Sequence, residues 1–251
     1  MSGHSKWSTI KRKKAENDQK KNSMFTKLIK NITSAVKTGG SPDPEANFKL
    51  KLAIDKARAS SMPLSNIESA IKKASGQGAD SAEMVEITYE GYAPGGVAII
   101  VQALTDNRNR TAAEIRHTFS KYNGNLGESG CVGWMFEQKG SAYVPATPHQ
   151  FEALTLKLMD LPIDDVSEDS DGLQITMAVS NFETVKKQLV EQKINFEDAE
   201  ITMLPKNTVK VENEDIARQI LTLIDALEDN EDVQDVFANF DIPEEILDKL
   251  E

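Results

Sequence analysis

The stretch VEITYEGYAPGGVAIIVQALTDNRNRTAAEIRHTF, residues 85–119, decides the fold class because its hydrophobic period changes along its length. Apolar and polar residues alternate over 85–89, which is typical of a half-buried strand. The turn Pro94-Gly95-Gly96 separates this strand from the continuous apolar run at 97–104, which is typical of a buried strand. Helical spacing of apolar residues follows over 111–122. This order of two strands and a helix predicts an α+β domain.

Similar combinations of strand and helix recur along the chain. Strands are expected near 132–136, 141–144, 173–179, 199–204, 208–211 and 233–237, and helices over 147–159, after Ser180 and over 216–227. A strand-helix-strand unit needs a second such unit to complete a four-stranded, ferredoxin-like β-α-β-β-α-β sheet. The first and last units can supply the halves of one sheet, with the middle segment inserted as a second α+β domain. A tandem order of the two domains is the alternative.

Residues 23–78 are predicted to form a small helical bundle. The first helix has one apolar stripe that ends at Gly39-Gly40 and is made of Phe25, Leu28, Ile29, Ile32 and Val36. Asp43 is the expected cap of the second helix, and Ser65 with Glu68 has the spacing of a capping box for the third. Thr111 with Glu114 has the same spacing at the start of the helix over 111–122.

Together these patterns predict an α+β multi-domain protein with an N-terminal helical bundle and two ferredoxin-like α+β domains, the third domain inserted into the second. The expected division is a basic flexible arm at 1–22, a helical domain at 23–78, a discontinuous α+β domain at 79–139 and 206–251, and an inserted α+β domain at 140–205.

Charge is distributed unevenly along the 251 residues. Residues 1–78 carry 16 Lys and Arg against 6 Asp and Glu, whereas residues 151–251 carry 8 against 26. The net charge of −11 therefore hides a basic N-terminal third that attracts polyanions and an acidic C-terminal third that repels them. Acidic runs such as 228–232 are interpreted as solvated surface, with a protein-contacting or phosphate-repelling surface as the alternative.

The sequence shows no cluster with the spacing of a catalytic or metal site. Its three histidines, His4, His117 and His149, are far apart in sequence, and none has the spacing of a metal ligand. Cys131, the single cysteine, fits a reducing compartment and is expected to be a small buried residue in a strand. No stretch approaches the roughly 18 apolar residues of a membrane helix. We therefore expect a cytoplasmic protein that is not an enzyme and uses no cofactor, metal or membrane. An enzyme is the competing class.

The strongest signal for function is the basic segment at the N-terminus. Trp7 and His4 can stack on an unpaired base, and lysines on the polar face of the first helix continue the positive charge of the arm. Basic arms of this kind bind phosphate backbones. The candidate nucleic-acid-binding residues in this part of the chain are His4, Lys6, Trp7, Lys11, Arg12, Lys13, Lys14, Lys20, Lys21, Lys27 and Lys30. A solubilising tail, or a docking site for an acidic protein, is the alternative.

A second candidate site is the loop Asp106-Asn107-Arg108-Asn109-Arg110. It precedes an expected helix N-terminus, where free backbone N–H groups and the guanidinium groups of Arg108 and Arg110 can converge on a phosphate. A solvated loop whose arginines pair with neighbouring acids is the alternative.

Long motifs in the chain resemble those of the YebC/PmpR family. They are GHSKWSTIKRKK at 3–14, FTKLIKNI at 25–32, DPEANFKLKLAIDKA at 43–57, MPLSNIESAIKKA at 62–74, YEGYAPGGVAIIVQALTDNRNRTAAEIRHTFSKYNGNLGESG at 89–130 and WMFEQKG at 134–140. The resemblance covers essentially the whole chain and weakens after residue 140. Phe48, Cys131 and the pair Tyr122-Asn123 depart from the usual pattern of the family, and none of them lies in the basic motif.

The resemblance implies three domains, the third inserted into the second, and a cytoplasmic, non-enzymatic protein. Members of the family are described as DNA-binding transcriptional regulators. Others, including a mitochondrial translational activator of cytochrome oxidase, are tied to translation or to relief of ribosome stalling. We therefore expect a nucleic-acid-binding regulator of gene expression, with acidic domains that face protein partners or solvent. DNA is the expected target, and ribosomal RNA is the alternative because no helix-turn-helix with a reading helix is evident.

Overall fold

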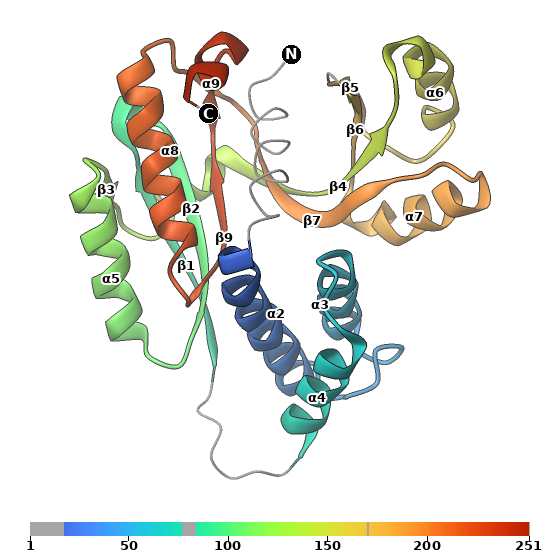
Figure 1. Ribbon diagram of the computed structural model, residues 1–251, viewed down its shortest axis with the longest axis horizontal. Helices are drawn as coiled ribbons and strands as arrows, with labels where there is room; N and C mark the ends of the chain where they lie inside the picture. The colour runs from blue at the N-terminus through green and yellow to red at the C-terminus, as the bar shows by residue number, and fades with distance from the viewer. Residues whose placement is uncertain (1–17, 77–83, 170, 251) are drawn as a thin grey trace. The chain divides into compact units, whose positions relative to one another are not determined.

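The computed structural model describes residues 18–76, 84–169 and 171–250 (Figure 1). These residues form two compact units. The first unit contains 18–76, 84–133 and 213–238, and the second contains 134–169, 171–212 and 239–250. Each unit has a four-stranded antiparallel sheet with helices, so the multi-domain α+β class expected from the sequence is confirmed. The finer division into an arm and three domains remains a prediction.

The first unit begins with a helical bundle made of α2 (Asp18–Thr38), α3 (Phe48–Ala59) and α4 (Leu64–Ser75). All three helices supply apolar side chains to one core, whose buried members are Leu28, Ile32, Ala35, Val36, Leu50, Ile54, Ala57, Met62, Ile67 and Ala70. The apolar stripe predicted for the first helix is therefore present, although Ile29 at its margin is 37% exposed. The large share of alanine limits the apolar area that this bundle buries.

Helix α3 begins at Phe48 because Asn47, and not Asp43, is its N-cap. The Asn47 side-chain oxygen accepts the N–H of Leu50 at 3.1 Å, and its amide nitrogen donates to the backbone oxygen of Ala35 at 2.8 Å. Gly39 makes room for this side chain, since a Cβ at that position would lie 2.2 Å from the Asn47 amide nitrogen. One amide thus caps α3 and ties it to α2.

The sheet of the first unit has the strand order β3-β1-β2-β9, with all neighbours antiparallel. Its strands are β1 (Val85–Tyr92), β2 (Ala98–Thr105), β3 (Asn125–Leu126) and β9 (Val233–Ala238). The short helix η1 (Pro94–Gly96) joins β1 to β2, and its two glycines adopt positive φ angles of 78° and 77°. Helices α5 (Arg108–Lys121) and α8 (Glu214–Glu228) lie beside each other against the sheet (Figure 1).

Two strand predictions for this sheet are wrong. Residues 133–135 form the short helix η2 (Gly133–Met135), and the third strand is the two-residue β3, which is too short to produce an alternating pattern. Residues 208–211 do not join the sheet either, because β8 (Val209–Lys210) pairs in parallel with β10 (Phe240–Asp241). The position in the sheet that 208–211 was expected to take is occupied by β1, which a short turn connects to its partner β2. The spatial order of the strands is still that of a ferredoxin-like sheet, although the chain enters the sheet at a different strand.

The predicted capping boxes of two helices do not form. Helix α4 follows Pro63, which supplies no side-chain cap, so Ser65 and Glu68 lie inside the helix. Helix α5 starts at Arg108 rather than Thr111, because the side chain of Asn107 accepts the N–H of Arg110 at 3.1 Å. The loop that carries the two candidate arginines is therefore the first turn of α5.

The second unit holds a sheet of order β5-β6-β4-β7, also antiparallel throughout. Its strands are β4 (Phe136–Pro145), β5 (Asp165–Glu168), β6 (Gly172–Met177) and β7 (Glu197–Pro205). The connections carry η3 (Pro148–Gln150), α6 (Phe151–Leu158), η4 (Val179–Asn181) and α7 (Phe182–Glu191), and α9 (Glu244–Leu250) lies after β10. This is the β-α-β-β-α-β order of a ferredoxin-like domain. All four strands lie, in sequence, between β3 and β9 of the first sheet.

Candidate nucleic-acid interface

The structure describes only part of the predicted interface. His4, Lys6, Trp7, Lys11, Arg12, Lys13 and Lys14 lie outside the described residues. Lys20 and Lys21 belong to α2, but their side chains are not described. Lys27, Lys30, Arg108 and Arg110 are described, and all four belong to the first unit.

Lys27 and Lys30 lie half-buried on α2; Lys27 reaches the last residue of α8, and Lys30 reaches the loop that follows it. The Lys27 ammonium donates to the backbone oxygen of Glu228. The Lys30 ammonium donates to the backbone oxygen of Glu231 at 3.0 Å and to Oδ1 of Asp232 at 3.0 Å. The basic face of α2 is thus held against an acidic turn of the same unit.

Arg110 reaches the same acidic turn from α5. Its Nη2 lies 2.7 Å from Oδ2 of Asp232 and 3.0 Å from Oδ1 of Asp106. These partners favour the charged guanidinium, and the hydrogen bond that Arg110 donates to Asp232 is the largest cause of the raised pKa of Arg110. Arg108, two residues earlier, is exposed and forms no ion pair with a described residue. The two arginines therefore have different surroundings.

Asp232 is the point at which these groups meet. Its carboxylate is buried and also accepts the hydroxyls of Thr111 at 2.8 Å and Thr105 at 3.2 Å. Burial by itself raises the pKa of this carboxyl, but hydrogen bonds from Arg110, Thr111 and Lys30 outweigh burial and lower the pKa to about 2. One carboxylate therefore joins α2, the end of β2, the first turn of α5 and the start of β9.

The stability of the first unit should depend on the ionisation of Asp232. Because its pKa is depressed from 3.8 to about 2, its contribution is complete above about pH 4 and is lost as the pH falls through 2. The shift corresponds to about 2 kcal/mol. We expect the difference in free energy of unfolding between wild type and Asp232→Asn to shrink by about 2 kcal/mol between pH 6 and pH 2. Urea unfolding followed by circular dichroism measures the free energy of unfolding of each protein. The prediction is wrong if the two proteins differ by the same amount at pH 6 and at pH 2.

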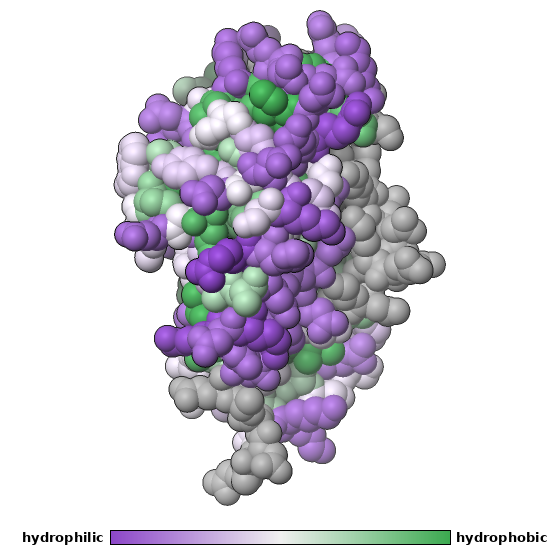
Figure 2. Space-filling model, turned by 90° about the vertical axis from the view of Figure 1, so that its left-hand side faces the viewer, coloured by the Kyte–Doolittle hydropathy of each residue, from purple (hydrophilic) through white to green (hydrophobic). Residues whose placement is uncertain are grey.

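Several other cations of the first unit have no such partner. Arg58 of α3, Lys72 and Lys73 of α4, and Arg116 of α5 are exposed and, like Arg108, form no ion pair with a described residue. The face shown in Figure 2 is largely hydrophilic, with small apolar patches. Exposed, unpaired lysine and arginine side chains on a hydrophilic surface are suited to contacts with phosphate groups.

A second buried carboxylate fixes the loop that follows β3. Glu90 accepts the N–H groups of Gly130, Val132 and Gly133 at 2.8, 2.8 and 2.6 Å. Burial raises the pKa of this carboxyl, but the three backbone hydrogen bonds outweigh burial and lower it. Cys131 lies half-buried in this loop and not in a strand as expected, and burial raises the pKa of its thiol. The glycine-rich loop thus binds an anion, which is the protein's own glutamate.

Two features are absent from residues 18–76, 84–169 and 171–250. No group of three or more His, Cys, Asp or Glu side chains is placed to hold a metal ion. No helix is both long enough and apolar enough to cross a membrane.

Comparison with known proteins assigns the family. The model of the TACO1/YebC protein N-terminal domain matches residues 5–77, and the model of the TACO1/YebC second and third domain matches residues 84–240. The chain belongs to the TACO1/YebC family. These two matches include the helical bundle, both four-stranded sheets and the buried carboxylates of Glu90 and Asp232.

Relatives of the TACO1/YebC family match the chain over nearly its full length. A protein of Syntrophomonas wolfei, named a probable transcriptional regulatory protein, is 51% identical over 98% of this chain and 99% of its own length. A protein of Chlorobium luteolum with the same name is 50% identical over the whole of both chains. The crystal structure of a conserved hypothetical protein from Aquifex aeolicus has a TM-score of 0.83 and 44% identity, covering 93% of this chain and 95% of that one.

Sequence reasoning missed the residues that organise this TACO1/YebC unit. The acidic run at 228–232 was expected to be solvated surface, but its last residue, Asp232, is buried among donors from distant segments. Glu90 was expected only as a polar position of an alternating strand, and its side chain is also buried. A signal existed for Glu90, because a carboxylate opposite the loop Gly-Cys-Val-Gly at 130–133 can accept several backbone N–H groups. Asp232 has no comparable local pattern.

Proposed function

We propose that the chain is a non-enzymatic regulator of gene expression that binds nucleic acid through its basic N-terminal arm and helical bundle. The arm residues His4, Lys6, Trp7, Lys11, Arg12, Lys13, Lys14, Lys20 and Lys21 supply phosphate contacts and base stacking. Arg108 supplies a further phosphate contact at the start of α5. Lys27, Lys30 and Arg110 add positive charge to the same region, while their contacts with the 228–232 turn hold it in place.

The contacts of the Asp232 carboxylate are the observation that supports this proposal. It accepts Lys30 from α2 and Arg110 from α5, so the lysine-rich helix and the arginine-bearing turn are neighbours in one unit. From the sequence alone, the basic N-terminal segment and the loop at 106–110 were two separate candidate sites for nucleic acid. Cations of α2 and α5 that are neighbours in one unit suit a phosphate backbone better than two isolated sites do.

DNA is the proposed target, because the curated relatives of this family are named probable transcriptional regulatory proteins. Ribosomal RNA is the second candidate. The exposed cations Arg58, Lys72, Lys73 and Arg108 lie on three different helices. This dispersal suits contacts with backbone and shape, which dominate recognition of folded RNA, more than it suits a single helix that reads bases.

Replacing Arg108 with alanine should weaken nucleic-acid binding several-fold and lower the salt dependence of log K by about one unit. Deletion of residues 2–21 should remove most of the binding, since it removes seven cations. Binding is measured by gel shift on genomic DNA fragments and by co-sedimentation with ribosomes, each at about 150 mM salt and over a salt series. Arg218→Ala, which removes the same charge from an exposed position on α8, is the matched control.

The two assays distinguish the targets. Saturable preference for one promoter, lost on deletion of the arm, supports the DNA target and removes the ribosome. Ribosome association lost on the same deletion, with only sequence-blind and salt-sensitive DNA binding, removes the transcriptional role. The proposal as a whole fails if the deletion and Arg108→Ala bind both targets as well as wild type does.

A further inference from the structure

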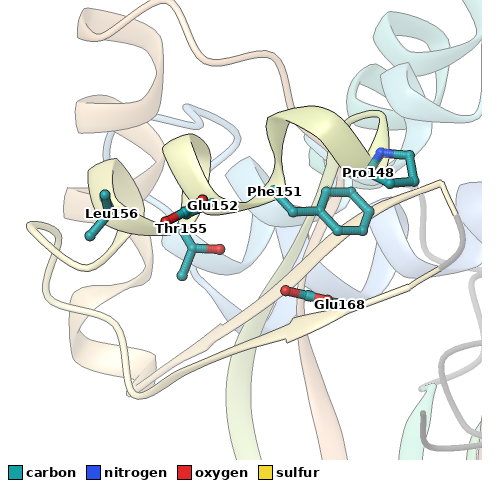
Figure 3. Close-up of a pocket in the computed structure, with 6 residues that line it drawn as sticks. All are labelled: Pro148, Phe151, Glu152, Thr155, Leu156 and Glu168. Carbon is teal, nitrogen blue, oxygen red and sulfur yellow. The ribbon is translucent and has the colours of Figure 1, made fainter.

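The second unit carries a groove at one end of its sheet, far in sequence from the basic region. Its lining consists of Pro148, Phe151, Glu152, Thr155 and Leu156 from η3 and α6, and Glu168 from β5. In Figure 3 the side chains of Phe151 and Thr155 point from α6 toward the strand that carries Glu168. The groove therefore lies between a helix and the outermost strand of the sheet.

Strand β5 is the end strand of its sheet. In the order β5-β6-β4-β7 it pairs with β6 on one side, and no described strand pairs with its other side. An end strand presents backbone N–H and C=O groups that can pair with an added strand. An extended peptide aligned on β5 would place alternate side chains into the groove beneath α6.

The apolar part of this site continues onto the exposed face of α6. Leu156 is 64% exposed and Met159, the next residue after the helix, is 68% exposed. Large apolar side chains at this level of exposure, beside a groove, are typical of an interaction surface. The hydroxyl of Thr155, a lining residue, is buried and has no hydrogen-bond partner among the described residues.

The charged groups of the groove are acidic. Glu152 and Glu168 are exposed on opposite sides of it, and no lysine or arginine is among its lining residues. Residues 134–212 and 239–251 carry 8 Lys and Arg against 19 Asp and Glu. Such a site repels phosphate and an anionic membrane surface and attracts cationic side chains.

We propose that the open edge of β5 and the groove beside it bind an extended segment of a partner protein in which lysine or arginine alternates with apolar residues. The segment adds a strand to the sheet at β5. Its apolar side chains pack on Phe151 and Leu156, and its cations pair with Glu152 and Glu168. The site serves protein recruitment and is separate from the basic region of the first unit.

The test selects, from a library of displayed random peptides, those that bind the full-length protein. Fluorescence anisotropy then measures how tightly the enriched peptides bind. The selected sequences should alternate basic and apolar residues, and their binding should slow amide hydrogen exchange at 165–168. The double variant Glu152→Gln/Glu168→Gln should weaken binding about five- to tenfold, because it removes two ion pairs at the rim. Leu156→Asp should weaken it by more than tenfold, since a charge replaces the exposed apolar anchor.

Glu212→Gln is the matched control, because it removes an exposed carboxylate of the same unit outside the groove, and it should bind as wild type does. The proposal is overturned if the selected peptides are acidic or share no pattern, or if exchange slows elsewhere than at β5. It is also overturned if both groove variants bind unchanged, or if an oligonucleotide protects β5 instead. The Arg108→Ala protein should bind the peptides normally, so this site and the nucleic-acid interface fail or succeed independently.

Discussion

Asp232→Ala is expected to lower the free energy of unfolding of the first unit by about 3 to 5 kcal/mol. The wild-type carboxylate is buried and pairs with Lys30 at 3.0 Å and with Arg110 at 2.7 Å. Alanine leaves both cations without this partner and also removes one acceptor of the buried Thr111 hydroxyl. Removing one member of a buried ionic network costs more than the net value of the pairs, because the remaining groups stay desolvated.

Amide hydrogen exchange shows which segments of the molecule lose stability in Asp232→Ala. Amides of α2, the first turn of α5 and the start of β9 should exchange faster in Asp232→Ala, while those of the β5-β6-β4-β7 sheet should be unchanged. Glu231→Gln is the matched control: its exposed side chain has no described partner, and its backbone oxygen still accepts Lys30. The network is refuted as a stabilising centre if Asp232→Ala and Glu231→Gln unfold at the same urea concentration.

Glu90→Ala should be the second most damaging change, with an expected loss of about 3 kcal/mol. It leaves the N–H groups of Gly130, Val132 and Gly133 without their acceptor. The loop should then open more often, and the Cys131 thiol, whose pKa burial and the Glu90 charge raise, should react about tenfold faster with a disulfide reagent. The reaction is specific because Cys131 is the single cysteine of the chain.

Two further variants in β1 serve as comparisons for the reactivity of the Cys131 thiol in Glu90→Ala. Glu90→Gln keeps an acceptor oxygen without the charge, so its thiol reactivity should lie between those of wild type and Glu90→Ala. Glu86→Ala removes an exposed carboxylate from β1, which pairs with Lys49 at 3.4 Å, and it should change the reactivity little. Equal reactivity in wild type and Glu90→Ala would show that the three hydrogen bonds do not hold the loop closed.

The elements with a strong hydrophobic period could be predicted from the sequence. Helix α2 and strands β1 and β2 were expected, because Leu28, Ile32 and Val36 recur at helical spacing and the strands alternate or run apolar. Helix α2 nevertheless begins at Asp18, within the segment 1–22 that was expected to be a flexible arm. Features without a period were missed. The two-residue strand β3 is one of them, and the starts of α3 and α5 depend on side-chain caps at Asn47 and Asn107.

The candidate site could be predicted only in part. Clusters of cations are visible in a sequence, so Lys27, Lys30, Arg108 and Arg110 were found as charged groups. Their partners were not, because Lys30 and Asp232 are 202 positions apart and only the folded chain brings them together. Whether a lysine faces solvent or an internal carboxylate is decided by tertiary contacts that local composition does not encode.

The order of synthesis gives the position of β9 a further consequence. The ribosome completes the inserted sheet, whose last strand ends at Pro205, before it makes β9 at Val233–Ala238. The first sheet, although it begins at Val85, therefore lacks its β9 edge until the inserted sheet has been translated. Asp232 is also translated after the inserted sheet, so Lys30 and Arg110 gain their shared counter-ion only at that stage.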